Sequence, residues 1–170
     1  FFQSYIEFSL AQLGDSVAGA GLVSGIHVTL TLLVAAWFGA WSIRIRDTIG
    51  LWWTLLAAMS LQVIIIGVMG WILAPLVVVL LLARSVPRAL MAPLINAAVT
   101  GRVAQRHRAT YLSLQSLCGR LSFAGMLLLL TTVVPTDESA SWASVSAAIR
   151  FSLWVALGAL AVFLIVASVR

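Results

Sequence analysis

The stretch TIGLWWTLLAAMSLQVIIIGVMGWILAPLVVVLLLA, residues 48–83, contains 36 residues and no charged side chain. As one α-helix rising about 1.5 Å per residue, it would be more than about 50 Å long. The hydrocarbon core of a bilayer is only about 30 Å thick, so a single helix would overshoot it. The residues in this stretch that favour a turn are Gly67, Gly70 and Pro75. The stretch therefore predicts two membrane-spanning helices joined by a short turn.

The composition of the whole chain agrees with a membrane protein. Of its 170 residues, 62% are hydrophobic and 9% are charged, and the mean hydropathy is +1.12. Soluble domains carry about 25% charged residues, which cover a water-facing surface. The net charge is +5, but the ten basic residues are all Arg and most lie in short gaps between apolar runs. This pattern is typical of membrane topology and argues against a nucleic-acid-binding protein.

The charged residues divide the chain into an all-α, polytopic bundle of five complete helices and the end of a sixth. Residues 1–13 are too short to span a membrane and are interpreted as the end of a truncated helix. Residues 71–100 are interpreted as one helix that carries Arg84 and Arg88 within the membrane. If the sequence RSVPR were instead a loop, the later basic segments would lie outside the cell, against the positive-inside rule. The predicted spans are about 17–42, 50–69, 71–100, 109–134 and 148–169.

The basic and acidic loops set the predicted orientation. Asp137 and Glu138 are expected in an outer loop, whereas the basic segment 102–108 is expected in the cytoplasm. The C-terminus then lies in the cytoplasm as well. The arginines expected there are Arg44, Arg46, Arg102, Arg106, Arg108 and Arg170.

Arg120 lies near the middle of its predicted span. An arginine at the centre of a membrane costs at least about 2.5–3.5 kcal/mol, so its side chain is expected to face a cavity or a partner. Ser113, Ser116 and Arg120 share one helical face through steps of three and four residues. A polar face on an apolar helix predicts a wall of a transport pathway.

Arg84 and Arg88 are also expected to share a helical face within the membrane. Pro87 lies between them and is expected to loosen the helix and expose backbone carbonyl groups. These two arginines are therefore further candidates for the pathway. The alternative for all three intramembrane arginines is that they pair with carboxylates and hold helices together.

Three other polar residues are candidates for the pathway. Gln3 and Glu7 lie four residues apart, on one face of the N-terminal helix. Glu7 is either a proton-coupling carboxylate or an ion-pair partner of an arginine. His27 lies inside its span and titrates near physiological pH, so it is either a proton relay or a hydrogen-bonding link to a neighbouring helix.

The segment PLINAAVTGRVAQRHRATYLSLQSLCGRL, residues 93–121, resembles the tenth helix, cytoplasmic loop and eleventh helix of bacterial major facilitator superfamily permeases. The resemblance implies that residues 1–170 correspond to nearly all of the C-terminal six-helix half of such a permease. Residues 39–50, GAWSIRIRDTIG, then occupy the loop between helices eight and nine, although Ile43 replaces the acidic residue of the family motif. The residues that carry the resemblance are Pro93, Asn96, Arg108, Ala109, Thr110, Ser113, Ser116 and Arg120.

The resemblance implies a function and a set of partners. The expected function is proton-coupled secondary transport of a small solute by alternating access, in the inner membrane of a bacterium. The expected partners are the lipid bilayer, a missing N-terminal six-helix half, a small-molecule substrate and protons. Asn96, Arg108 and Thr110 are expected at a cytoplasmic loop or gate, together with Arg44 and Arg46.

Other functional classes were weighed against transport. The chain contains no His-Glu-x-x-His and no Gly-x-Ser-x-Gly motif, so we expect no enzyme, catalytic residue, metal or cofactor. The rival function is a non-transporting membrane scaffold or sensor built from the same helices. A second six-helix repeat before Phe1 would favour transport, and a signalling domain there would favour the rival.

Overall fold

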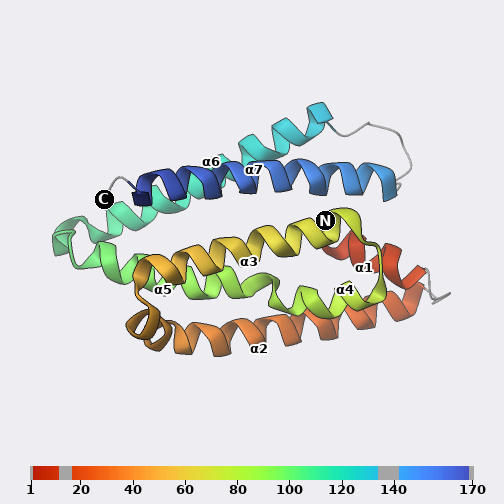
Figure 1. Cartoon of the computed structure of the whole chain (residues 1–170), viewed down its shortest axis with the longest axis horizontal. Coiled ribbons are helices and arrows are strands. Elements are labelled where there is room, and N and C mark those ends of the chain that lie inside the picture. Colours follow the sequence, from red (N-terminus) through yellow and green to blue (C-terminus); the bar gives the residue numbers. More distant parts are fainter. Residues whose placement is uncertain (1, 12–16, 134–141, 169–170) are drawn as a thin grey trace.

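The computed structural model describes residues 2–11, 17–133 and 142–168, which are almost entirely helical and contain no β-strand. The helices run back and forth along one elongated bundle (Figure 1). The predicted all-helical fold is thus confirmed for this part of the chain. In order, the elements are α1 (Phe2–Ala11), α2 (Val17–Ile49), α3 (Leu51–Trp71), α4 (Pro75–Leu80), η1 (Leu81–Ser85), α5 (Val86–Thr100), η2 (Gln105–His107), α6 (Arg108–Val133) and α7 (Trp142–Ser168).

Five stretches of the described chain are long and apolar enough to cross a membrane, as predicted. Their outer surface is apolar too, because large side chains such as Leu33, Trp53 and Leu128 are 62%, 66% and 70% exposed. Helices that are apolar all round suit a lipid environment. The stretches are Val23–Ile49, Leu51–Trp71, Leu76–Val99, Gln105–Thr132 and Trp142–Ser168.

One end of the bundle gathers the basic residues of the connections and is called the basic end below. It holds the turn between α2 and α3 and the connection between α5 and α6, both on the left of Figure 1. Its arginines are Arg44, Arg46, Arg102, Arg106 and Arg108. The predictions for Asp137, Glu138 and Arg170 lie outside the described residues.

Helix α2 continues past the predicted boundary at residue 42 and ends at Ile49. The charged side chains of its last turns have partners on the same helix. The Arg44 guanidinium lies 4.7 Å from the centre of the Trp41 ring, and Arg46 Nη2 lies 2.6 Å from Asp47 Oδ1. A helix need not stop where it leaves the membrane, since its backbone hydrogen bonds persist in water. Gly50 alone then reverses the chain with φ of 87°, a conformation that glycine adopts readily.

The predicted span 71–100 is broken twice. Trp71 closes α3, and the backbone is extended at Ile72 and Ala74 before α4 begins at Pro75. The second break is η1, a 3₁₀ segment directly before α5 and its early Pro87. Proline lacks an N–H and disfavours the regular α-helix before it, which accounts for the tighter winding there. Pro87 itself lies in the first turn of α5, and the expectation that it loosens the helix and exposes backbone carbonyl groups stays a prediction.

The end of the bundle opposite the basic end is held together by α1. Tyr5 is fully buried, and its ring packs edge-on against Trp142 with ring centres 5.7 Å apart. Helix α7 thus begins at Trp142 and not at the predicted residue 148, because Trp142 packs on this aromatic ring. The core around Tyr5 contains Ile65, Met69, Val77, Leu81 and Ile149, from α3, α4, η1 and α7.

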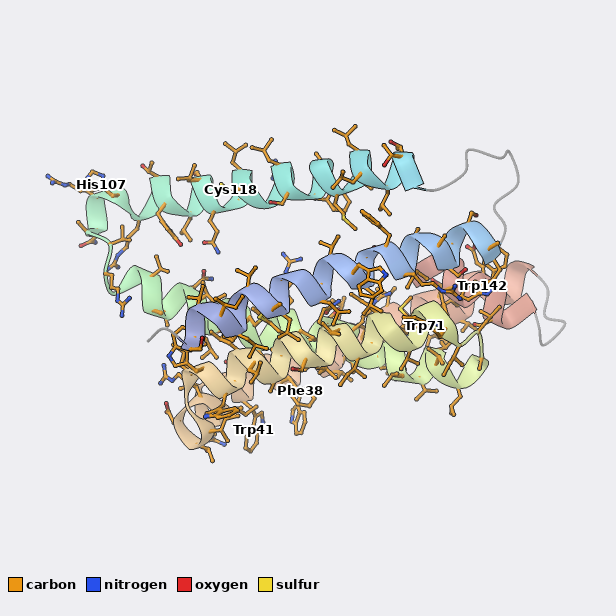
Figure 2. The ribbon with its side chains drawn as sticks, turned by 45° about the horizontal axis from the view of Figure 1, so that its top comes forward. Phe38, Trp41, Trp71, His107, Cys118 and Trp142 are labelled. Carbon is orange, nitrogen blue, oxygen red and sulfur yellow. The ribbon has the colours of Figure 1, made fainter. Side chains whose placement is uncertain are left out.

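Helix α6 stands apart from the rest of the bundle. Every residue from 112 to 124 is exposed, although the helix is regular from Arg108 to Val133. Figure 2 shows this helix, marked by Cys118, beside the packed group formed by the other helices. The space between α6 and that group holds the candidate site.

Candidate functional site

A cavity of about 830 Å³, called the arginine cavity, lies between α5 and α6. Its size falls within the range of about 300–1,000 Å³ that is usual for small-molecule sites. Both helices contribute one face to it. The lining residues are Arg88, Ala92 and Asn96 from α5 and Leu112, Gln115, Ser116, Gly119, Arg120 and Phe123 from α6.

The sequence spacing explains why these side chains face one cavity. On α5, Arg88, Ala92 and Asn96 follow one another at intervals of four residues, which keeps them on one helical face. On α6, Ser116 and Arg120 have the same spacing. The predicted polar face of α6 is thus aligned with a polar face of α5.

Arg88 and Arg120 lie at the same level of the bundle. Arg88 is twelve residues before Thr100, where α5 ends, and Arg120 is twelve residues after Arg108, where α6 begins. At about 1.5 Å per residue, each arginine is about 18 Å from the connection that joins the two helices. Both guanidinium groups therefore enter the cavity well away from the basic end.

Among the described residues, neither Arg88 nor Arg120 makes an ion pair, and the ion pair found there joins Arg46 to Asp47 at the basic end. The other polar side chains of the cavity are Asn96, Gln115 and Ser116, which are uncharged. The arginine cavity consequently carries two positive charges and favours an anion.

Ser113 lies beside this cavity and not in it. It lines a shallower hollow of about 450 Å³ with Leu112, Ser116, Leu117 and Arg120. The structure thus brings the three predicted residues Ser113, Ser116 and Arg120 to one side of α6, with Arg120 shared between the two hollows.

Arg84 and Arg88 differ in their relation to the cavities, since Arg88 lines two of them. Arg84 lies in η1, half-buried, and lines none of the three cavities described here. That the two arginines share a helical face stays a prediction.

His27 is buried on α2 and bonds to the neighbouring helix. Its Nε2 atom lies 2.9 Å from the carbonyl oxygen of Val78 on α4, which fixes Nε2 as the donor. Its Nδ1 atom is buried and has no partner among the described residues. This geometry agrees with the interpretation of His27 as a link between helices, and a role in the pathway stays a prediction.

Glu7 and Gln3 lie away from the arginine cavity. Both belong to α1, which packs at the end opposite the basic end through Tyr5. The Glu7 side chain is exposed and lines none of the three cavities, and the Gln3 side chain lies outside the described residues.

The predicted gate residues are divided between two places. Asn96 lines the arginine cavity, on the side toward the basic end. Arg108 and Thr110 are exposed at the start of α6, where Arg108 Nε lies 3.3 Å from the carbonyl oxygen of Val103. Arg44 and Arg46 lie at the end of α2, so four of the five surround the basic end (Figure 1).

A second cavity, called the apolar cavity, adjoins the first and was not predicted from the sequence. It has a volume of about 410 Å³, and it shares Arg88, Ala92 and Gln115 with the arginine cavity. Gln62 and Gln115 were missed, although each is a polar residue within an apolar helix, which is the signal that identified Arg120. The remaining lining residues are Ala58, Met59, Val63, Pro87, Met91, Ile95, Ala156 and Ala159.

Comparison of the chain with protein-family models, with curated proteins and with solved structures finds no match. The class of the protein therefore rests on its own features. Five long apolar helices with an apolar outer surface, together with a cavity lined by charged and polar side chains, are features of a polytopic α-helical membrane protein.

Proposed function

We propose that this chain is one half of a secondary transporter of the major facilitator type, which moves a small solute by alternating access. The observation that carries the proposal is the pair Arg88 and Arg120, which line one cavity from two helices without a carboxylate partner among the described residues. The sequence resemblance of residues 93–121 supports the same family.

The energetic cost of these arginines supports a role in transport. Each costs at least about 2.5–3.5 kcal/mol within a membrane, and that cost is reduced where water or a bound anion solvates the charge. If these arginines formed ion pairs, a structural role alone would explain their presence in the membrane. Among the described residues, however, Arg88 and Arg120 have no ion-pair partner. A water-filled pathway that admits an anion accounts for both residues.

The broken helix supports alternating access. Transporters often use discontinuous helices beside the substrate site, since such helices bend and expose backbone groups. Here α4, η1 and α5 form one interrupted span, and Arg88 follows the interruption directly. A change of angle at η1 would move Arg88 relative to Arg120.

The exposed face of α6 supports a missing partner. Leu114, Leu121 and Phe123 on this helix are 56%, 62% and 65% exposed, next to a cavity that carries charge. An N-terminal half packed there would enclose the arginine cavity between two bundles. The basic end then faces the cytoplasm of a bacterium, and protons are the proposed coupling ions, with Glu7 and His27 as the titratable candidates.

Transport by the full-length protein tests this function. Purified protein in proteoliposomes should take up at least one organic anion when a substrate or proton gradient is applied. Residues 1–170 alone should give no more uptake than protein-free vesicles, because they supply one side of the pathway. If the full-length protein moves no solute, it is a scaffold or sensor; if residues 1–170 transport alone, a missing half is not needed.

A further inference from the structure

The arginine cavity and the apolar cavity are two parts of one site. They share three residues, Arg88, Ala92 and Gln115. Ala92 has only a methyl side chain, so little separates the two volumes at that point. A single molecule can therefore occupy both cavities at once.

We propose that the site binds an amphipathic organic anion, whose acidic head lies between Arg88 and Arg120 and whose apolar tail enters the apolar cavity. This inference rests on the proposed function and specifies its substrate class. It excludes organic cations and small hydrophilic anions as preferred substrates.

The arginine cavity provides the binding groups for an acidic head. A guanidinium group presents a planar set of donors that matches a carboxylate through two parallel hydrogen bonds. Arg88 and Arg120 approach from opposite helices at the same level. Asn96, Gln115 and Ser116 add uncharged donors around them. Two positive charges in one cavity also repel an amine.

The apolar cavity provides the space for a tail. Its walls include Met59, Val63, Met91 and Ile95, which carry no charge. Methionine side chains are flexible and adapt to irregular apolar shapes. Ala156 on α7 has a short side chain and leaves the volume open. The tail is therefore favoured by the burial of apolar surface, at about 25 cal/mol per Å².

The two parts of the site predict how affinity changes with ligand structure. The probes are the straight-chain carboxylates butanoate, hexanoate and octanoate, with the alkylammonium ion of each length for comparison. Binding is measured by calorimetry on the full-length protein in lipid nanodiscs, with empty nanodiscs subtracted. We expect the Kd of the carboxylates to fall about fourfold per added methylene until the cavity is full. The alkylammonium ions should not bind.

Two kinds of substitution separate the contribution of the acidic head to binding from that of the apolar tail. Met59→Trp reduces the apolar cavity, so it should remove the gain in affinity from butanoate to octanoate, while Arg88 and Arg120 still bind the carboxylate head. Met91→Phe repeats this from α5 in case the first variant does not fold. The matched control is Val162→Trp, at an exposed position of α7 outside the cavity, which should keep the full gain. Arg88→Gln with Arg120→Gln should abolish specific binding of all three carboxylates.

The outcomes distinguish this inference from the proposed function. Equal Kd values for butanoate and octanoate, or alkylammonium binding as tight as carboxylate binding, would overturn the inference. If the Kd still falls with chain length in the double arginine variant, the carboxylates only partition into the membrane, and the inference is overturned as well. If an anion is transported without any dependence of its affinity on tail length, the inference fails and the proposed function stands. If long-chain carboxylates bind but none is transported, the proposed function fails.

Discussion

Arg150 at the start of α7 donates a hydrogen bond from Nε to the carbonyl oxygen of Gly70 near the end of α3, at 2.9 Å. Its guanidinium also lies 5.7 Å from the centre of the Trp71 ring. Arg150 therefore joins two helices at the end opposite the basic end. Arg88 and Arg120, in contrast, face a cavity, and the two kinds of arginine should respond differently to substitution.

Arg150→Ala should destabilise the protein without changing anion binding. A hydrogen bond between a charged donor and a carbonyl contributes about 1.5–3 kcal/mol, and part of this is lost to water at an exposed residue. We therefore expect a lower thermal midpoint in detergent, by a few degrees, and an unchanged Kd per folded molecule. An unchanged midpoint would mean that the contact contributes nothing to stability.

Gly70 and Gly67 on α3 form a matched pair for substitution by alanine. Alanine stabilises a helix by about 1 kcal/mol relative to glycine at either position. A Cβ atom at Gly70 would lie 3.3 Å from Arg150 Cγ and 3.4 Å from Ile149 Cγ2, whereas at Gly67 the nearest atom is Leu153 Cδ1 at 3.8 Å. We expect Gly67→Ala to raise the thermal midpoint more than Gly70→Ala does. The reverse order would contradict the close approach of α3 and α7.

Tyr5→Phe should destabilise the packing of α1. The Tyr5 hydroxyl donates to the carbonyl oxygen of Ile72 at 2.5 Å and accepts from the N–H of Ala74 at 3.2 Å. Leaving a fully buried backbone group without a partner costs about 1–3 kcal/mol, and we expect less here because these contacts are part-buried. The control is Tyr111→Phe on α6, whose hydroxyl has no hydrogen bond to a described residue. Differential scanning fluorimetry should show a lower midpoint for Tyr5→Phe alone; equal midpoints would contradict this role.

The predicted orientation is tested with single cysteines in a Cys118→Ser background. Ala104→Cys lies at the basic end and Ile72→Cys at the opposite end, and both positions are exposed. An impermeant thiol reagent added to intact cells should label position 72 and spare position 104, because basic loops stay in the cytoplasm. Labelling of position 104 from outside would reverse the topology.

The sequence predicts the number and order of the helices because charged residues cannot lie in lipid without a cost. An effect of Pro87 on its helix is expected from the sequence as well, since the effect of proline on the backbone is local. That Arg88 lines two of the described cavities and Arg84 none of them is not predictable in this way, because it depends on how the helices pack. The contact of Tyr5 with Ile72 joins residues 67 positions apart, and no local pattern encodes it.

The candidate site is predictable only in part. The polar face of α6 that includes Ser116 and Arg120 follows from helical spacing alone. The apolar cavity does not, because Met59 and Ala156 look like ordinary packing residues until α3 and α7 are placed beside α5. Cavities form where packing between helices is incomplete, and this is a property of the assembled bundle.

The most direct measurement compares transport and stability for Arg120→Ala in the full-length protein. If Arg120 lines a transport pathway, uptake should fall to the level of protein-free vesicles while the thermal midpoint stays nearly unchanged. Arg120→Lys should fail as well, because an ammonium group does not present the planar pair of donors. A structural ion pair predicts instead a loss of about 3–5 kcal/mol of stability. Strong destabilisation by Arg120→Ala, with recovery after a second substitution of a nearby acidic residue, would contradict the proposed pathway.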